Sequence, residues 1–212
     1  MKTVVCLPVY NEEESLQDMI DQIREVGFDL FVVDEHSKDK TLEIAEKNRV
    51  PVYQRDGSGK GWGVRKAVEV AKKMGYDNLA LIDCDCTYPP KYIPELLKYL
   101  PEYDMAIGKR AISDIPRLNR LPNKFFNFLI NMLFLSSLKD VNSGLRVIKL
   151  DQIPDLDAEK FDIEAQITIR ALKKGLRIKE IPIEYLERKG KPKVRVKDGL
   201  VILFRIIRER FQ

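Results

Sequence analysis

The chain has 212 residues, of which 44% are hydrophobic and 33% are charged, a composition that excludes a disordered or fibrous protein and allows one domain with its own core. The net charge of +4 is unevenly distributed, because residues 1–169 carry 23 Lys/Arg and 28 Asp/Glu whereas residues 170–212 carry 14 and 5. The basic carboxyl-terminal part either faces an anionic partner, such as a membrane surface, a phosphate or a nucleic acid, or forms an ordinary solvated surface.

Cysteine content and hydropathy indicate the cellular compartment in which the protein acts. The cysteines Cys6, Cys84 and Cys86 are too few and too unevenly spaced for a disulfide framework, which predicts a reduced, cytosolic compartment. A strand-like segment follows residue 1 directly, so we expect no signal peptide. The longest mostly apolar stretch, 125–138, has 14 residues, fewer than the about 20 that a membrane-spanning helix needs. We therefore expect any action at a membrane to take place from its surface.

Strand and helix patterns alternate through the first half of the chain. A continuous apolar run over 3–7 predicts a buried strand, and Asn11 with Glu14 forms a capping box that predicts the start of a helix. There follow, in chain order, a strand over 30–33, a helix over 40–47, a strand over 50–53, a glycine-rich turn, a helix over 62–74, a strand over 79–82, a helix after Pro90 and a strand over 105–107. This rhythm predicts right-handed crossovers and a mostly parallel sheet.

The second half is less regular. A helix is expected over 117–138, where Asn123, Asn127 and Asn131 recur every four residues and leave a wide apolar face. The remaining expected elements are a strand over 145–148, a helix over 163–173, an extended segment over 176–185 and an amphipathic helix over 200–211. Without an internal repeat or a linker, the pattern predicts a single α/β domain in which helices flank a mostly parallel central sheet.

Carboxylates mark the end of one predicted strand. In a parallel sheet the ligand crevice lies beyond the carboxyl ends of the strands, and Asp83 and Asp85 stand at such an end. Two carboxylates at this spacing can share Mg²⁺ or Mn²⁺ with a phosphate group. The alternative is a capping or turn role, since Asp155 and Asp157 have the same spacing within a predicted loop. The strand-end position favours the metal role for Asp83 and Asp85.

Other motifs exclude several chemistries. The glycine-rich segment 57–63 lacks the Gly-Lys-Ser/Thr of a phosphate-binding P-loop, and predicts a flexible turn in which Lys60 can meet anionic groups. His36 is the only histidine, which disfavours a zinc site or a histidine-activated nucleophile. The basic run 188–197 indicates phosphate binding or a solvated loop. Because no aromatic residues are interleaved with these charges, we expect no nucleic-acid partner.

Short motifs at and beyond the strand ends occur in a distinctive order. They are Pro8-Val-Tyr-Asn-Glu12, Val33-Asp34-Glu-His-Ser37, Gly59-Lys-Gly61, Asp83-Cys-Asp85, Gly108-Lys-Arg110, Asp140-Val-Asn-Ser-Gly-Leu-Arg146, Phe161-Asp-Ile-Glu164 and Arg188 to Lys193. This set resembles the family 2 glycosyltransferases of the GT-A fold, and within them the dolichyl-phosphate mannose synthases and related polyprenyl-phosphate glycosyltransferases. The resemblance runs through nearly the whole chain. It implies a GT-A fold in which residues 1–110 bind the nucleotide and residues 111–212 bind the acceptor with the help of amphipathic helices.

The resemblance also implies residue roles. The nucleotide sugar would be bound by Pro8, Tyr10, Glu12, Val33, Asp34, Glu35, Lys60, Ile82, Asp83, Cys84 and Asp85. A Mg²⁺ or Mn²⁺ cofactor would be held by Asp83 and Asp85, with Thr87 assisting. The phosphates of donor or acceptor would meet Arg110, Arg120, Lys124, Arg188 and Lys193. Asp83, Asp85 and Arg110 would then be the catalytic residues.

The reaction implied is the transfer of a hexose, with inversion, from GDP-mannose or UDP-glucose to a polyprenyl phosphate. The enzyme would associate peripherally with the cytosolic face of a membrane through the 117–138 and carboxyl-terminal helices, with a membrane subunit as a further partner. A phosphate acceptor is already anionic and needs no strong base, whereas a hydroxyl acceptor would need Asp162 or Glu164 as the base. The alternatives are therefore a transferase with a hydroxyl acceptor and an inactive sugar-nucleotide-binding subunit.

The sequence departs from the family in several places, two of which concern the expected binding residues. The usual Asp-Asp-Gly-Ser turn reads Asp34-Glu35-His36-Ser37, so a histidine stands where glycine would allow a left-handed backbone. In the middle helix, Asn119 and Asn123 stand at the positions of the Arg and Ser that bind the acceptor phosphate in mannose synthases, beside Arg120 and Lys124.

Overall fold

A seven-stranded sheet in the order β3-β2-β1-β4-β6-β5-β7 forms the centre of the molecule. The computed structural model describes residues 1–193 and 196–212. Its strands are β1 (Thr3–Val9), β2 (Asp29–Asp34), β3 (Val52–Gln54), β4 (Asn78–Leu81), β5 (Met105–Arg110), β6 (Arg146–Lys149) and β7 (Ile178–Ile183). Only β6 runs antiparallel to its neighbours, β4 and β5. The predicted α/β fold with a mostly parallel sheet is confirmed.

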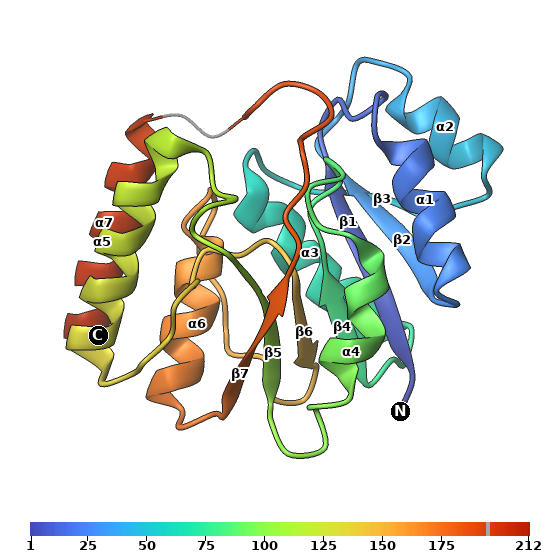
Figure 1. Ribbon diagram of the computed structural model, residues 1–212. Helices are drawn as coiled ribbons and strands as arrows, with labels where there is room; N and C mark the ends of the chain where they lie inside the picture. The colour runs from blue at the N-terminus through green and yellow to red at the C-terminus, as the bar shows by residue number, and fades with distance from the viewer. Residues whose placement is uncertain (194–195) are drawn as a thin grey trace.

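Helices cover both faces of this sheet. They are α1 (Leu16–Glu25), α2 (Thr41–Lys47), α3 (Lys60–Lys73), the short 3₁₀ turn Pro90–Tyr92, α4 (Ile93–Leu97), α5 (Arg117–Phe134), α6 (Ile163–Lys173) and α7 (Val196–Phe211). Buried residues of α1 and α4 pack on one face, and those of α3 and α6 pack on the other. Helices α5 and α7 lie side by side on the outer side of α6 and form a further layer (Figure 1).

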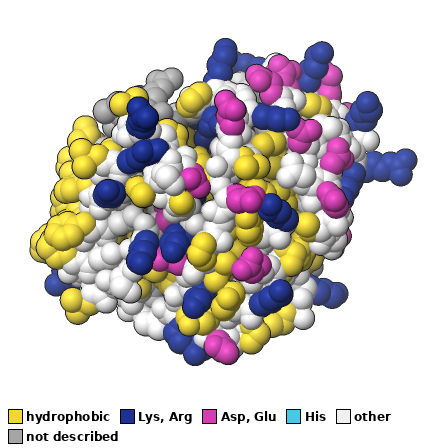
Figure 2. All heavy atoms as spheres, in the orientation of Figure 1, with side chains coloured by type: hydrophobic (Ala, Val, Ile, Leu, Met, Phe, Trp, Pro, Cys, Tyr) yellow, Lys and Arg dark blue, Asp and Glu magenta, His cyan; other side chains and the backbone are white. Residues whose placement is uncertain are grey.

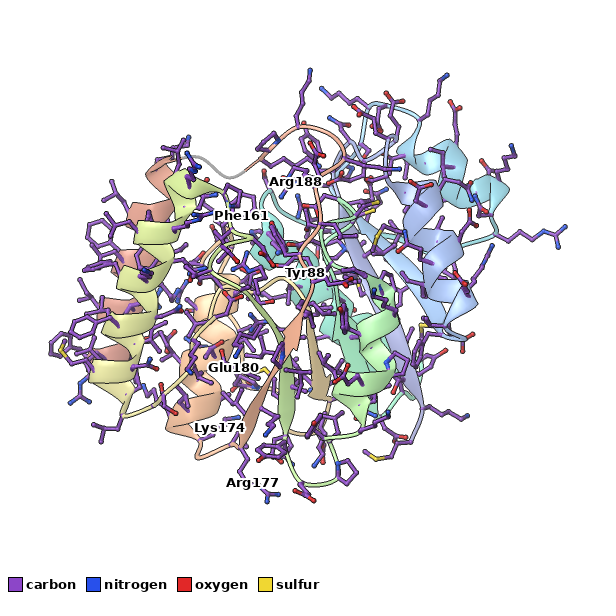
Figure 3. The ribbon with its side chains drawn as sticks, viewed as in Figure 1. Tyr88, Phe161, Lys174, Arg177, Glu180 and Arg188 are labelled. Atoms are coloured by element: carbon purple, nitrogen blue, oxygen red, sulfur yellow. The ribbon has the colours of Figure 1, made fainter. Side chains whose placement is uncertain are left out.

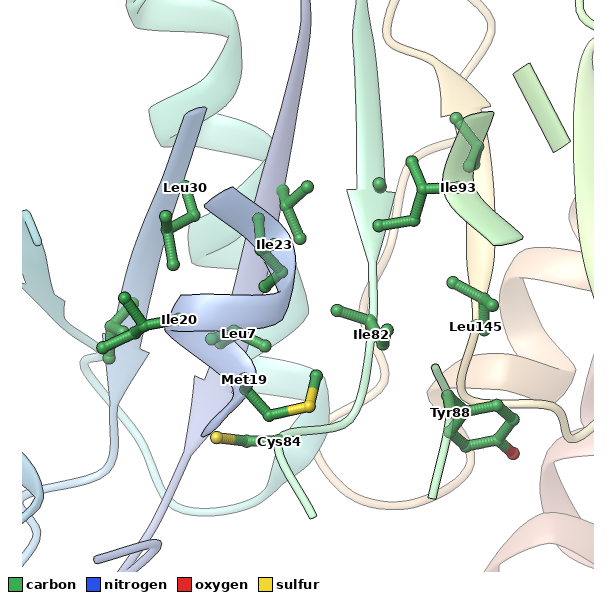
Figure 4. Close-up of a cluster of buried hydrophobic side chains, with 14 of the residues drawn as sticks. Leu7, Met19, Ile20, Ile23, Leu30, Ile82, Cys84, Tyr88, Ile93 and Leu145 are labelled. Carbon is green, nitrogen blue, oxygen red and sulfur yellow. The ribbon is translucent and has the colours of Figure 1, made fainter. Parts of the chain in front are cut away.

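Alternation along the strands builds the two main cores. In β1, Val5 and Leu7 face the α1–α4 side, whereas Val4 and Cys6 face the α3–α6 side, as expected when successive side chains point to opposite faces. Figure 4 shows Met19 of α1 lying over the sheet among these apolar side chains. Strands that are buried on both faces therefore appear in the sequence as the continuous apolar runs from which they were predicted.

The start of the first helix differs from the prediction. The Asn11–Glu14 capping box does not form, because α1 begins at Leu16 and Asn11 adopts a left-handed backbone with φ of 49°. The side-chain oxygen of Asn11 instead accepts from the backbone N–H of Lys38 at 2.8 Å, and its own N–H donates to Ser37 Oγ at 2.9 Å. Asn11 thus ties the end of β1 to the loop after β2.

Other boundaries shift by a few residues. Helix α3 begins at Lys60 rather than at 62, α5 ends at Phe134 rather than at 138, and α7 begins at Val196 rather than at 200. The chain leaves α5 at Leu135, whose φ of 51° is left-handed. No helix within the described residues is long and apolar enough to cross a bilayer. The division into a nucleotide-binding part over 1–110 and an acceptor-binding part over 111–212 stays a prediction, and the single sheet takes strands from both.

Candidate active site

The predicted site residues gather where the parallel strands end. β1, β2, β4 and β5 point the same way, so their carboxyl ends meet at one edge of the sheet, the upper edge in Figure 1. Figure 3 shows Tyr88 and Arg188 toward this edge, with Lys174 and Arg177 at the opposite one. The residues that the strand-end rule singled out therefore come together at one edge of the sheet.

Lys60 bridges two carboxylates at the centre of this edge. Its Nζ lies 2.5 Å from Asp83 Oδ1 and 2.5 Å from Glu164 Oε1. Burial by itself lowers the pKa of Lys60, but the charges of Asp83 and Glu164 outweigh it and leave the pKa raised. The lysine is therefore a fixed cation at the first turn of α3, not part of a flexible turn. Lys60 thus joins Asp83 to Glu164 of α6. From the sequence, Glu164 was predicted only as a possible base for a hydroxyl acceptor.

Asp85 has a separate set of partners. Its Oδ2 lies 2.5 Å from Arg188 Nη1, while its Oδ1 accepts from the backbone N–H of Thr87 at 3.1 Å and from the Thr87 hydroxyl at 2.5 Å. Burial and the charge of Asp83 raise the pKa of Asp85, and Arg188 partly offsets this rise. Thr87, predicted to assist a metal, acts here by orienting the Asp85 carboxylate.

A segment after β7, residues 186–193, lies across the ends of β1 and β4. The backbone N–H groups of Leu186 and Lys189 donate to the carbonyls of Thr87 and Asp85, both at 2.9 Å. The segment is further held by ion pairs of Arg188 with Asp85, Lys189 with Asp18 and Lys193 with Glu12. Of the basic run predicted to bind phosphate, Arg188, Lys189 and Lys193 therefore lie at or beside the site. Lys197 belongs to α7, and Arg195 lies outside the described residues.

Glu12 and Tyr10 lie beneath the end of this segment. Lys193 pairs with Glu12, and its Nζ lies 5.9 Å from the centre of the Tyr10 ring. Burial raises the pKa of Glu12, and the hydrogen bond and charge of Lys193 partly lower it again. Tyr10 is 38% exposed, which leaves part of its ring open to a planar ligand.

The turn after β2 keeps its shape despite the sequence change. His36 adopts φ of 55°, so it takes the left-handed conformation that glycine would provide. The buried Asp34 carboxylate fastens this turn by accepting from the N–H of Ser37 at 3.1 Å and from Gln54 Nε2 at 3.1 Å. Glu35 pairs with Arg55 and accepts from Gly59 N–H at 2.8 Å, so it connects this turn to the start of α3.

Arg110 is paired within the protein at the end of β5. Its Nε and Nη2 donate to the two oxygens of Asp140 at 2.8 and 2.6 Å, the two-pronged geometry that favours Arg over Lys. The guanidinium lies 5.8 Å from the Tyr88 ring and 5.2 Å from the Tyr185 ring. Burial acts to lower the pKa of Arg110, but Tyr88 and Asp140 raise it overall. Asp140 belongs to one of the motifs on which the family resemblance rests, but the sequence alone did not predict its pairing with Arg110.

Some predicted ligands do not point their side chains into the site. Val33 and Cys84 are buried in the cores on either side of the sheet, and Figure 4 shows Cys84 beside Met19. They can meet a ligand only through their backbone. Pro8 and Ile82 line a cavity of about 10 Å³ next to Lys60, which has room for about one water molecule.

Two residues predicted to bind phosphate, Arg120 and Lys124, belong to α5. Arg120 donates to the carbonyls of Ile115 at 2.7 Å and of Ser113, so it fastens the loop before α5. Lys124 is exposed on the surface of α5. Asn123 is buried and donates to Asp140 Oδ1 at 3.3 Å, which connects it to Arg110. Of the two asparagines at the family's phosphate-binding positions, only Asn119 is exposed.

The carboxylates at the end of β4 fit a divalent cation. No group of three or more His, Cys, Asp or Glu residues forms a metal cage in the described part of the chain. Mg²⁺ and Mn²⁺ are commonly held by only one or two carboxylates together with substrate phosphates. Asp83 and Asp85 supply such oxygens, and the charge of Asp83 raises the pKa of Asp85.

The fold and the position of the Asp83–Asp85 pair define the class. A mostly parallel sheet with an Asp-x-Asp at the end of a central strand is the arrangement of GT-A glycosyltransferases, and the chain is a glycosyltransferase. It belongs to glycosyl transferase family 2, whose model matches residues 4–152.

Relatives and solved structures agree with this family. The chain is 32% identical over 200 residues to the dolichyl-phosphate hexose transferase of Haloferax volcanii, covering 90% of this chain and 85% of the relative. It is 30% identical over 210 residues to the undecaprenyl-phosphate mannosyltransferase of Micrococcus luteus, covering 89% and 85%. Glucosyl-3-phosphoglycerate synthase from Mycobacterium tuberculosis, solved with Mn²⁺, UDP-glucose and phosphoglyceric acid, superposes with a TM-score of 0.84 at 19% identity, covering 99% and 80%. A further structure of that synthase holds Mg²⁺ and UDP.

Proposed function

We propose that the protein transfers a hexose, mannose or glucose, from GDP-mannose or UDP-glucose to a polyprenyl phosphate, with inversion at the sugar carbon. The observation that carries this proposal is the similarity, over about nine-tenths of the chain, to relatives named for hexose transfer to dolichyl or undecaprenyl phosphate. The likeness to the phosphoglycerate-glucosylating enzyme supports the fold. The sequence relatives therefore support the acceptor, and the geometry of the strand ends supports the donor site.

Donor binding is assigned to the edge formed by β1, β2 and β4. Tyr10 offers a ring face to the base, and Glu12, near the Asp34 turn, offers a carboxylate to the ribose hydroxyls. Asp83 and Asp85 would hold Mg²⁺ or Mn²⁺ against the diphosphate, where the cation stabilises the negative charge that develops on the leaving group. Arg188, 2.5 Å from Asp85, places a second positive charge beside the same phosphates.

The acceptor phosphate would approach from the β5 side. Its attacking oxygen is already anionic, so the protein needs to position it and to balance its charge rather than to remove a proton. Arg110, Arg188 and Lys193 carry positive charge at this edge, and Arg120 and Lys124 carry it on α5. In the cell the enzyme would work at the cytosolic surface of a membrane, because the polyprenyl chain of the acceptor remains in the bilayer.

A hydroxyl acceptor is the second candidate, and one observation favours Glu164 over Asp162 as its base. Asp162 is buried, and its Oδ2 lies 2.7 Å from Nε of Arg205 in α7. This ion pair leaves Asp162 unsuited to act as the base. Glu164 lies within the site, across Lys60 from Asp83. A base at Glu164 would need Lys60 to withdraw, since a carboxylate that is tightly paired with an ammonium group is a weak proton acceptor.

Product analysis with crossed substrates tests the proposal. Purified protein with Mn²⁺ would be given GDP-mannose or UDP-glucose, each with a short-chain polyprenyl phosphate, the corresponding free alcohol or phosphoglycerate. We expect a polyprenyl-phosphate hexose product from one donor and no product from the alcohol. Transfer to phosphoglycerate or the alcohol alone would overturn the lipid-phosphate acceptor, and tight nucleotide binding without any turnover would favour an inactive subunit.

Matched aspartate variants test the metal assignment. Asp85→Asn should abolish transfer and Mn²⁺-dependent nucleotide binding. Asp155→Asn alters the other Asp-x-Asp pattern at an exposed position, and should leave both unchanged. Normal transfer by Asp85→Asn would show that the metal site lies elsewhere.

A further inference from the structure

Lys60 is confined by the β6–α6 loop, residues 150–162. An added Cβ on Gly61 would lie 2.2 Å from the carbonyl oxygen of Ala158, and one on Gly59 would lie 2.4 Å from the next carbonyl oxygen of this loop. The loop therefore packs against the backbone on both sides of the lysine, an approach that glycine allows. It leads directly into α6, whose first turn carries the second carboxylate partner of the lysine.

The β6–α6 loop contains no helix or strand, and side chains hold its backbone. The N–H groups of Asp157 and Ala158 donate to the side-chain oxygen of Gln166 at 2.9 and 2.8 Å. Gln166 is fully buried, and its amide nitrogen donates to Glu209 of α7 at 2.8 Å. Because a buried backbone N–H needs a partner, a side chain of α6 that is bonded to α7 sets the path of this loop.

Two arginines complete the connection between the loop and the helices. Arg205 of α7 is 8% exposed, and its guanidinium lies 2.7 Å from Asp162 and 2.9 Å from Asp157. Arg170 of α6 lies 2.9 Å from the same Asp157 and 2.8 Å from Glu209. We use the name α6–α7 network for the side chains of Asp157, Asp162, Gln166, Arg170, Arg205 and Glu209. The network holds the β6–α6 loop at its middle and at its end.

Attachment of α7 does not by itself explain this network. Ile202 and Ile206 of α7 already lie in one apolar cluster with Ile169 of α6. The side of the molecule that α5 and α7 form in Figure 2 shows mainly hydrophobic and basic side chains, whereas Glu209 is turned inward at 1% exposed. Burying ionic groups adds little stability compared with apolar packing, but it can specify one geometry. The network is therefore better explained by a geometry that it fixes.

We propose that Arg205 and Gln166 are positioning residues for the transfer reaction. They hold the β6–α6 loop and the first turn of α6, which in turn hold Lys60 between Asp83 and Glu164. The ammonium group lies 2.5 Å from each carboxylate, and a misplacement of about 1 Å in a site can lower a rate by about a hundredfold. The inference rests on the proposed function, because Asp83 is the residue through which the network would act on the donor.

The network also accounts for the second Asp-x-Asp pattern of the chain. Asp157 binds Arg170 and Arg205 through its carboxylate. Asp155 is exposed, and it contributes its carbonyl oxygen, which accepts from Arg170 at 2.6 Å. The pattern thus serves the loop rather than a metal. Arg205, predicted as one cation of an amphipathic helix, is turned toward the same loop.

Acetylation of the ligand-free protein tests the hold on Lys60 without any transfer reaction. Lys60 and Lys66 of α3 have similarly exposed side chains, 17% and 23%, so Lys66 serves as the internal reference when labelling by acetic anhydride is followed by mass spectrometry. Arg205→Met and Gln166→Met should each raise the labelling rate of Lys60 relative to Lys66 by about fivefold or more. Arg205→Lys should raise it less. Arg210→Met, at an exposed position of α7, is the matched control and should leave it unchanged.

Transfer rates then connect the hold on Lys60 to catalysis. At a temperature where circular dichroism shows the variants to be folded, Arg205→Met should lower kcat by about tenfold or more. Arg205→Lys should recover part of this loss, and Arg210→Met should keep the full rate. Lys60 labelling that stays slow in both folded variants, an equal rise at Lys66, or an unchanged kcat despite faster labelling would overturn the inference. The expected labelling in a chain that transfers no hexose would instead refute the proposed function and support the hold on Lys60.

Discussion

The Arg110–Asp140 pair allows a quantitative test of how the site is held together. The Asp140 side chain is 1% exposed and that of Arg110 is 10% exposed. Asp140 accepts from the Arg110 backbone N–H at 3.0 Å as well as from Nε and Nη2. Removing one partner of a buried ion pair costs about 3–5 kcal/mol. Because asparagine keeps one acceptor oxygen, we expect Asp140→Asn to cost about 3 kcal/mol, a fall in Tm of about 9 °C for a chain of this length.

A double-mutant cycle isolates the pair from other effects. Arg110→Met leaves the Asp140 carboxylate buried without its cation, so it should also cost about 3 kcal/mol. The Asp140→Asn, Arg110→Met double variant should cost less than the sum of the two by about 2 kcal/mol, measured by urea unfolding with unchanged m-values. Additive costs, to within about 0.5 kcal/mol, would refute the coupling. Glu184→Gln, which breaks the exposed pair with Lys91, is the control and should leave stability unchanged.

The same variants distinguish a structural role of Arg110 from a role in binding the substrates. If Asp140 acts by orienting Arg110, Asp140→Asn should lower kcat/KM for transfer at a temperature where the variant is fully folded. Arg110→Lys keeps the charge but loses the two-pronged geometry, and should recover only part of the activity that Arg110→Met loses. Full activity in Arg110→Met would show that Arg110 is structural.

Three further variants probe other parts of the molecule. Lys193→Gln should lower Tm at neutral pH. Because burial raises the pKa of Glu12 and Lys193 lowers it, the Tm difference from the unaltered chain should narrow as acid protonates Glu12, and a gap that stays constant would contradict the pairing. Gly144→Ala would place a Cβ 2.1 Å from Asp83 Oδ2 and 3.0 Å from Cε2 of the buried Tyr88, so transfer should fall about tenfold or more and Tm should fall by about 3–9 °C. Full activity at a temperature where the variant is folded would show that Asp83 can move freely. Gly199→Ala meets only Phe126 at 3.8 Å, so it should raise stability by about 0.5–1 kcal/mol by improving a helix position, as thermal unfolding would show.

Local patterns predicted the sheet because its strands are buried on both faces. An apolar run such as 3–7 has few other stable conformations, and an aspartate after such a run stands at the ligand edge by topology. Helix starts were less predictable. Asn11 had the sequence of a cap, but its side chain is taken by the backbone of Lys38, a contact between segments that local spacing does not reveal.

The bridging role of Lys60 was also beyond local patterns. Glycines on both sides of this lysine predicted flexibility, but Gly61 lets α3 pack closely against the chain before α6, where an added Cβ would lie 2.2 Å from the carbonyl oxygen of Ala158. The glycines therefore allow close packing rather than motion. The partner Glu164 is distant in sequence, so only the folded chain brings it to Lys60 and Asp83.

Basic residues of the carboxyl-terminal part include three groups with different surroundings. Arg170 and Arg205 pair inward with Asp157 and Glu209, and hold α7 against α6. Arg188, Lys189 and Lys193 pair with carboxylates at or beside the candidate site. Lys197, Arg208 and Arg210 are left exposed on α7. Of these three, Arg208 also pairs with Asp157. The uneven charge allowed either an anionic partner or a solvated surface, and the role of each cation follows from which carboxylates the fold places beside it.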